Sequence, residues 1–192
     1  MRKLQFIILL LLQVFVVQQS QAESGYDLWL RYPQVENQKM LDEYRKAVQQ
    51  VVVAGDSKTA QAIQNELAVG LKGLLGVTGS LQSQTLNKSG ILVGTPTSSS
   101  AIAALNLGAK LEALGNDGYI IQNKTIGKVS ALAVASKTDV GALYGTFHLL
   151  RLMQTNQSLA NLNIEEKPLT QYRLLNHWDN LDRTVERGDS GF

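Results

Sequence analysis

The sequence predicts an α/β fold, a two-layer α/β sandwich in which helices pack on one face of a mixed β-sheet. Three observations support this fold class. Short runs rich in Val, Ile and Leu alternate with longer amphipathic segments, in the order β-α-β-α-β-β-α-β. Hydrophobic residues make up 44% of the 192 residues, which is enough to form a buried core. The chain has no cysteine, so disulfides and thiolate chemistry are excluded.

The first predicted strand and helix have the patterns of buried elements. Residues 47–54 contain four β-branched valines, Val48 and the run Val51-Val52-Val53, which predict a strand. Residues 59–75 are predicted to form a helix, and either Asp56 or Ser57 is the expected N-terminal cap. The apolar residues that fall on one face of this helix are Ile63, Leu67, Leu71 and Leu74.

The next strand and helix are joined by a short turn. Residues 90–94 read Gly-Ile-Leu-Val-Gly, which predicts a strand buried on both faces. Residues 100–114 are predicted to form a helix capped by Ser98 or Ser99. The turn at 94–99 lacks the Gly-Lys-Ser/Thr of a phosphate-binding loop, so we interpret it as a plain capped turn.

A hairpin and a long helix follow. Residues 119–121 and 128–135 are predicted to pair as hairpin strands. Asp139 is the expected cap of the helix that comes next. Gly141 and Gly145 lie four residues apart, one above the other, and should let this helix approach the sheet closely.

The chain offers little material for a metal site. His148 lies in the predicted helix that begins at Asp139, among apolar neighbours and without a second ligand at metal spacing. A structural role for this histidine is therefore favoured over a ligand role. With two histidines and no cysteine in the whole chain, no metal site is expected.

The first 22 residues have the pattern of a secretory signal peptide. Arg2 and Lys3 precede an apolar run at residues 6–17, and small residues follow at the positions that a signal peptidase reads. The run is shorter than the roughly 20 residues that a membrane-spanning helix needs. We expect cleavage before Glu23, a secreted or periplasmic protein, and no membrane attachment after cleavage.

The charge balance argues against nucleic-acid binding. The formal net charge of the whole chain is +2. Removing Arg2 and Lys3 from the 18 basic residues leaves 16, against 16 acidic residues. A mature chain with balanced charge lacks the strongly basic character of a nucleic-acid-binding domain.

The densest polar cluster lies at residues 176–188. Trp178 stands there beside a histidine, and Asp179 and Asn180 follow it directly. An aromatic ring that stacks on a pyranose, with carboxylate and amide groups bonding the hydroxyls, is typical of a sugar subsite. From the residue types alone, a sugar site and a structural loop remain equally good interpretations.

Residues 172–188 resemble the opening strand and loop of the catalytic barrel in glycoside hydrolase family 67, the α-glucuronidases of xylan breakdown. Upstream segments are similar to the accessory domain of that family, namely residues 26–32, 91–96, 117–119 and 143–151. The resemblance implies a signal peptide (1–22), an α/β accessory domain (23–168) and the first strand and loop of a (β/α)8 barrel (169–192). Residues 173–175 would be that first strand.

The resemblance also implies an activity. Members of the family remove (4-O-methyl)-D-glucuronic acid from xylooligosaccharides with inversion, using one carboxylic acid and one carboxylate base. The implied partners are oligosaccharides derived from glucuronoxylan, and no metal or organic cofactor is implied. Trp178 is implied to line the glucuronic acid pocket, and Asp179 and Asn180 to shape its loop.

One departure and one absence limit what carries over. After Glu186-Arg187-Gly188 the family usually continues with Tyr-Ala, where this chain has Asp189-Ser190. The catalytic carboxylates of the family come from later barrel strands, so no catalytic residue is expected in these 192 residues. The chain alone is therefore expected to be inactive, as the N-terminal part of a longer enzyme.

Two other functions remain open from the sequence. The chain could be the accessory domain of another exo-glycosidase, similar to the β-hexosaminidases. It could also be a stand-alone carbohydrate-binding module. The sequence that follows Phe192 would distinguish these possibilities.

Overall fold

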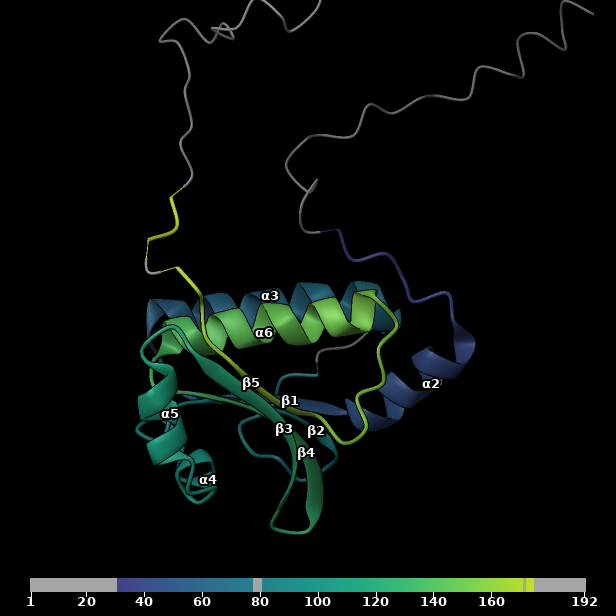
Figure 1. Cartoon of the computed structure of the whole chain (residues 1–192). Coiled ribbons are helices and arrows are strands. Elements are labelled where there is room, and N and C mark those ends of the chain that lie inside the picture. Colours follow the sequence, from purple (N-terminus) through teal and green to yellow (C-terminus); the bar gives the residue numbers. More distant parts are fainter. Residues whose placement is uncertain (1–30, 78–80, 171, 175–192) are drawn as a thin grey trace, which may run out of the picture. The chain divides into compact units, whose positions relative to one another are not determined.

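The computed structural model describes residues 31–77, 81–170 and 172–174 (Figure 1). The predicted signal peptide therefore lies outside the described residues. Among the described residues, no helix combines the length and the hydropathy that crossing a bilayer requires.

A mixed five-stranded sheet forms the centre of the fold, in agreement with the predicted class. Its strand order is β1-β2-β4-β3-β5. The first two pairings, β1 with β2 and β2 with β4, are parallel, and β3 pairs antiparallel with both β4 and β5. The strands are β1 (Gln50–Val53), β2 (Gly90–Gly94), β3 (Tyr119–Ile126), β4 (Val129–Ser136) and β5 (Asn163–Glu166).

Two long helices lie side by side on one face of the sheet (Figure 1): α3 (Lys58–Leu75) and α6 (Asp139–Gln154). The main core lies between these helices and the sheet, and it also takes in α2 (Gln38–Ala47). Leu67 of α3, Val134 of β4 and Leu149 of α6 are fully buried there. This layer matches the predicted packing of helices on one face.

Two short helices cover part of the opposite face, so the helices are not confined to one side of the sheet. They are α4 (Ser100–Ala103) and α5 (Gly108–Leu114). Ile102 and Leu111 from these helices pack against Leu92 of β2 and Ala133 of β4. Every residue of β2 is buried. The prediction that this strand is buried on both faces is therefore confirmed. A strand buried on both faces needs elements packed on each side of the sheet, so α4 and α5 are consistent with that prediction.

The predicted helix at 100–114 is wrong as one element, because the chain forms α4 and α5 instead. Asn106 breaks the helix, since its φ of 55° lies in the left-handed region. Ser99 caps α4 by accepting a hydrogen bond from the Ile102 N–H at 3.2 Å. Ser98 stays within the preceding turn.

The predicted N-terminal cap is confirmed for α3 and is wrong for α6. Ser57 caps α3 and accepts from the Ala60 N–H at 3.0 Å, as predicted. Thr138, and not Asp139, caps α6. The Asp139 carboxylate instead accepts a hydrogen bond from the Ser57 hydroxyl at 2.5 Å, which ties the N-terminal ends of the two helices together.

Gly141 and Gly145 do bring α6 close to the sheet. A Cβ atom at Gly141 would lie 2.1 Å from Ser136 Oγ, and one at Gly145 would lie 2.6 Å from a methyl group of Val134. Both distances are far shorter than van der Waals contact, so a side chain at either position would push the helix away from β4.

Three further elements differ from the prediction. Helix α2 and strand β5 are not expected from the sequence, and β5 reads Asn-Ile-Glu-Glu, a polar edge strand without apolar alternation. Arg173 and Leu174 are not in a strand, because their backbone pairs with no strand in the described part of the chain. Leu175 lies outside the described residues.

Buried tyrosines predict a loss of stability in alkali. Burial, aided by the charge of Glu43, raises the pKa of Tyr44 from 10.0 to about 12, and burial also raises the pKa of Tyr119. A raised pKa means that the folded state binds the tyrosine proton more tightly than the unfolded state does. The resulting contribution to stability is complete below pH 10 and is lost as the pH rises through about 12. Thermal melts should show the transition moving down over this window. Tyr44→Phe should flatten part of the dependence, and unchanged alkaline sensitivity would contradict the assignment.

Candidate functional site

The predicted sugar-binding residues Trp178, Asp179 and Asn180 lie outside the described residues. The structure does describe residues 172–174, which lead directly to them. We call this segment, together with the domain residues that it contacts, the platform; the segment immediately precedes the predicted site in the sequence.

Arg173 fastens this segment to the α/β domain. Its guanidinium donates to the Asp117 carboxylate at 2.5 Å and to the Tyr144 hydroxyl at 3.3 Å, and it lies 5.1 Å from the centre of the Tyr144 ring. A second nitrogen donates to the Thr170 carbonyl at 2.9 Å. The hydrogen bonds to Tyr144 and Asp117 raise the pKa of Arg173, so its guanidinium stays protonated.

A small pocket opens beside Arg173. It has a volume of about 370 Å³, and its walls include Tyr119, Tyr144, Glu166 and Arg173. Among the described residues that line it, Glu166 supplies the single carboxylate. Acid–base hydrolysis of a glycoside uses two carboxylates across the scissile bond, so these lining residues do not form such a pair by themselves.

His148 supports the wall of this pocket. Its Nδ1 lies 2.8 Å from the Tyr119 hydroxyl, and the two rings meet edge to face with centroids 5.7 Å apart. The histidine therefore has a structural partner, which agrees with the role favoured by the sequence. In the part of the chain that the structure describes, no group of three or more His, Asp or Glu residues is placed to hold a metal ion.

The turn at 94–99 uses its polar groups internally. The Thr95 N–H donates to Ser98 Oγ at 2.9 Å, and the Ser98 N–H donates to Thr95 Oγ1 at 3.0 Å. These bonds occupy the N–H groups of Thr95 and Ser98 within the turn itself. The cap predicted at this turn is confirmed, since the Ser99 hydroxyl accepts from the Ile102 N–H.

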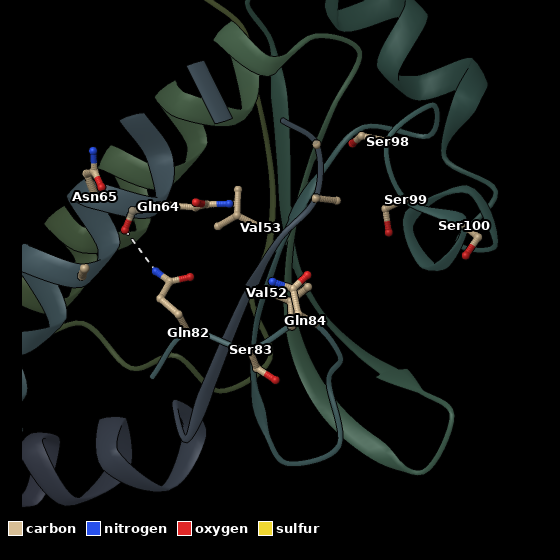
Figure 2. Close-up of a pocket in the computed structure, with 13 residues that line it drawn as sticks. Val52, Val53, Gln64, Asn65, Gln82, Ser83, Gln84, Ser98, Ser99 and Ser100 are labelled. Atoms are coloured by element: carbon tan, nitrogen blue, oxygen red, sulfur yellow. Dashed lines mark hydrogen bonds between the residues drawn. The ribbon is translucent and has the colours of Figure 1, made fainter. Parts of the chain in front are cut away.

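A second cavity lies along the free edge of β1, and Figure 2 shows the side chains that line it. We call it the polar groove; it is lined by residues 52–55, by 64, 65 and 68 of α3, and by 82–84 and 98–100. Its volume is about 870 Å³. Sequence reasoning missed this groove, because its walls come from four separate segments and contain no motif.

Arg173 provides a direct test of the platform. Arg173→Lys keeps the charge but loses the planar stacking on Tyr144 and the second donor. We expect faster hydrogen exchange and faster proteolysis at residues 169–174, because an exposed ion pair holds its own segment in place but contributes little to global stability. The melting temperature should change little. A large loss of global stability, or unchanged exchange in this segment, would contradict the anchoring role.

Comparison with known proteins agrees with this architecture. Residues 28–149 match the family model described as the glycosyl hydrolase family 67 N-terminus, and residues 152–192 match the model of the family 67 middle domain. The first match alone covers more than half of the chain.

Several curated relatives are α-glucuronidases by name. The chain is 29% identical to the alpha-glucuronidase of Hypocrea jecorina over 196 residues, covering 95% of the chain and 22% of the relative. It is 30% identical to the probable alpha-glucuronidase A of Neosartorya fischeri over 88% of the chain and 20% of the relative. For the probable alpha-glucuronidase A of Aspergillus oryzae, identity is 27% over 93% of the chain and 21% of the relative.

The chain thus spans about a fifth of the length of the curated relatives that it matches. The two family models follow one another along it without overlap, in the order N-terminus and then middle domain. Together with the α/β fold, these matches show that the chain belongs to glycosyl hydrolase family 67.

Proposed function

We propose that this chain supplies the N-terminal part of an α-glucuronidase that removes (4-O-methyl)-D-glucuronic acid from xylooligosaccharides. The observation that carries the proposal is the pair of family matches, which run in order from residue 28 to residue 192. The relatives named alpha-glucuronidase support the same type of hydrolase. The substrates are oligosaccharides that carry glucuronic acid.

The α/β domain acts as a rigid platform in this proposal. Arg173 fixes the segment at 172–174 against Asp117 and Tyr144, immediately before the polar cluster at 176–188. A sugar subsite must be held in place by its supporting residues if it is to bind a substrate productively. We assign Trp178 to the wall of the glucuronic acid pocket, with Asp179 and Asn180 shaping its loop.

Catalysis requires carboxylates from outside this chain. Several of the described carboxylates already have structural partners. Glu112 pairs with Lys137 at 2.6 Å, Asp117 pairs with Arg173, and Glu43 accepts hydrogen bonds from the Ser158 hydroxyl and the Leu159 N–H. These positions support a scaffold role, whereas an inverting hydrolase holds its two carboxyl groups roughly 6.5–9.5 Å apart around a water molecule.

Export completes the proposal. Arg2 and Lys3, the apolar run at 6–17 and the small residues before Glu23 support a cleaved signal and a secreted or periplasmic enzyme. N-terminal sequencing of the exported protein is expected to begin at Glu23.

The reading frame beyond codon 192 tests the proposal. We expect the genomic DNA to continue in frame with further barrel strands that carry acidic residues. A frame that continues into an unrelated catalytic domain would instead favour another exo-glycosidase. A clean stop followed by no related sequence would favour a stand-alone binding module and would overturn the proposal.

A further inference from the structure

None of the described residues that line the polar groove is charged. Its walls consist of amide, hydroxyl and small apolar side chains together with the backbone. A ligand that is a phosphate, a carboxylate or a metal ion would meet no opposite charge there. The composition of the groove therefore selects a neutral ligand.

Three amide side chains of the groove are available to a ligand. The side chains of Gln64, Asn65 and Gln84 line the groove and make no hydrogen bond to another residue in the described part of the chain. Figure 2 shows Gln64 reaching across the groove toward Val53 of β1. Each amide has both donor and acceptor groups, which is the combination that neighbouring hydroxyls of a sugar require.

Other side chains hold the wall of the groove in position. The Gln82 side-chain amide donates to the Gln64 carbonyl at 3.0 Å, as the dashed line in Figure 2 shows. The Ser83 hydroxyl donates to the Thr85 carbonyl at 2.8 Å. The segment at 82–84 is thereby fastened to α3, and the groove is present before any ligand binds.

The backbone of β1 adds a further donor and acceptor. The Val51 N–H donates to the Leu81 carbonyl, and the Val51 carbonyl accepts from the Ser83 N–H, both at 2.8 Å. Backbone groups two residues apart in a strand point to the same side. The N–H and carbonyl of Val53 therefore point out of the sheet edge, where Val53 lines the groove.

The free edge is too short to bind a peptide as an added strand. Val51 is already paired with the segment at 81–83, and the Ala54 N–H donates to the Val93 carbonyl within the sheet. Strand addition uses a succession of alternate residues, and only Val53 is available. A compact ligand with several hydroxyl groups fits this arrangement better.

We propose that the polar groove binds a neutral pyranose, namely an unsubstituted xylose unit of the oligosaccharide. The choice of xylose rests on the proposed function, whereas the preference for a neutral polyol rests on the groove itself. Val53 and Ala68 offer an apolar surface to the C–H face of the ring. The described lining of the groove includes no aromatic side chain, so the dissociation constant should be on the order of 1 mM.

Titration of the 192-residue chain with xylotriose, followed by amide NMR, tests the proposal. We expect saturable shifts of the Val53 N–H and of the Gln64 and Asn65 side-chain amides. Glucuronic acid alone should cause no such shifts. Absence of saturable shifts at these groups, or a stronger response to glucuronic acid, would overturn the proposal.

Two neighbouring exposed positions on α3 provide a matched pair of variants. Ala68 lines the groove, whereas Val69 does not and is 61% exposed. Ala68→Trp should fill the groove and weaken xylotriose binding at least about tenfold, while Val69→Trp should leave it unchanged. Equal effects of the two substitutions would contradict the site.

The proposed groove site and the proposed enzymatic function can be refuted independently of each other. If the chain binds xylotriose but a longer enzyme that contains it releases no glucuronic acid, the groove proposal stands and the proposed function is refuted. If that enzyme releases glucuronic acid but xylotriose does not bind at Val53, the proposed function stands and the groove proposal is refuted.

Discussion

Gly141→Ala is expected to destabilise the protein by about 3 kcal/mol, the upper part of the range for overpacking a dense interior. The new Cβ would lie 2.1 Å from Ser136 Oγ and 2.6 Å from the Gly118 carbonyl oxygen. These two groups also share a buried hydrogen bond of 2.7 Å, so neither can move without breaking it. The better helix propensity of Ala recovers no more than about 1 kcal/mol. Urea unfolding followed by circular dichroism measures the difference.

Gly108→Ala is the matched control for this prediction. Gly108 also lies in a helix, but no atom lies within 4 Å of the position that its Cβ would occupy. The substitution should leave stability unchanged or raise it by up to about 1 kcal/mol. Similar losses for both variants would show that close approach of α6 to the sheet is not what Gly141 provides.

Leu149→Ala is expected to cost about 3–4 kcal/mol, within the range for large-to-small substitutions in a core. Leu149 is fully buried, in the core that joins α3 and α6 to the sheet. Removal of its side chain leaves a cavity that rigid strands on one side cannot fill. The loss should appear as a lower urea midpoint with an unchanged dependence on denaturant.

Leu169→Ala is the same chemical change at a fully exposed position. In the 192-residue chain it should alter stability by less than about 0.5 kcal/mol. A large loss at Leu169, or a negligible one at Leu149, would contradict the assignment of the core.

The fold was predictable where a local pattern and the tertiary environment agree. The glycine-bounded run at 90–94 forms β2 with the expected bounds, and Ser57 caps α3. Gly141 and Gly145 could be assigned to close packing because their spacing matches the helical period. In each case a few residues close together in the sequence are enough to predict the local structure.

Prediction failed where distant residues decide the structure. Strand β5 is polar, and only its pairing with β3 makes it a strand. The break at Asn106 depends on a single left-handed residue within an otherwise helical pattern. The polar groove is formed by four segments that are distant in the sequence. The local sequence around Gln64 or Gln84 therefore does not predict it.

Residue types suggest the candidate sugar site, and the family resemblance alone implies the roles of its residues. Trp178, Asp179 and Asn180 lie outside the described residues, so their roles remain predictions. What the structure adds is the platform just before them, in which Arg173 bonds to Asp117 and Tyr144. No local pattern in the sequence links Arg173 to residues 29 and 56 positions away.

Release of glucuronic acid from an aldouronic acid tests the central claim most directly. The assay compares the 192-residue chain with the longer product that the proposed function requires. We expect no release by the 192-residue chain, and release of the inverted β-anomer by the longer product. Release by the 192-residue chain alone, or none by the longer product, would contradict the proposal that this chain is a non-catalytic part of an α-glucuronidase.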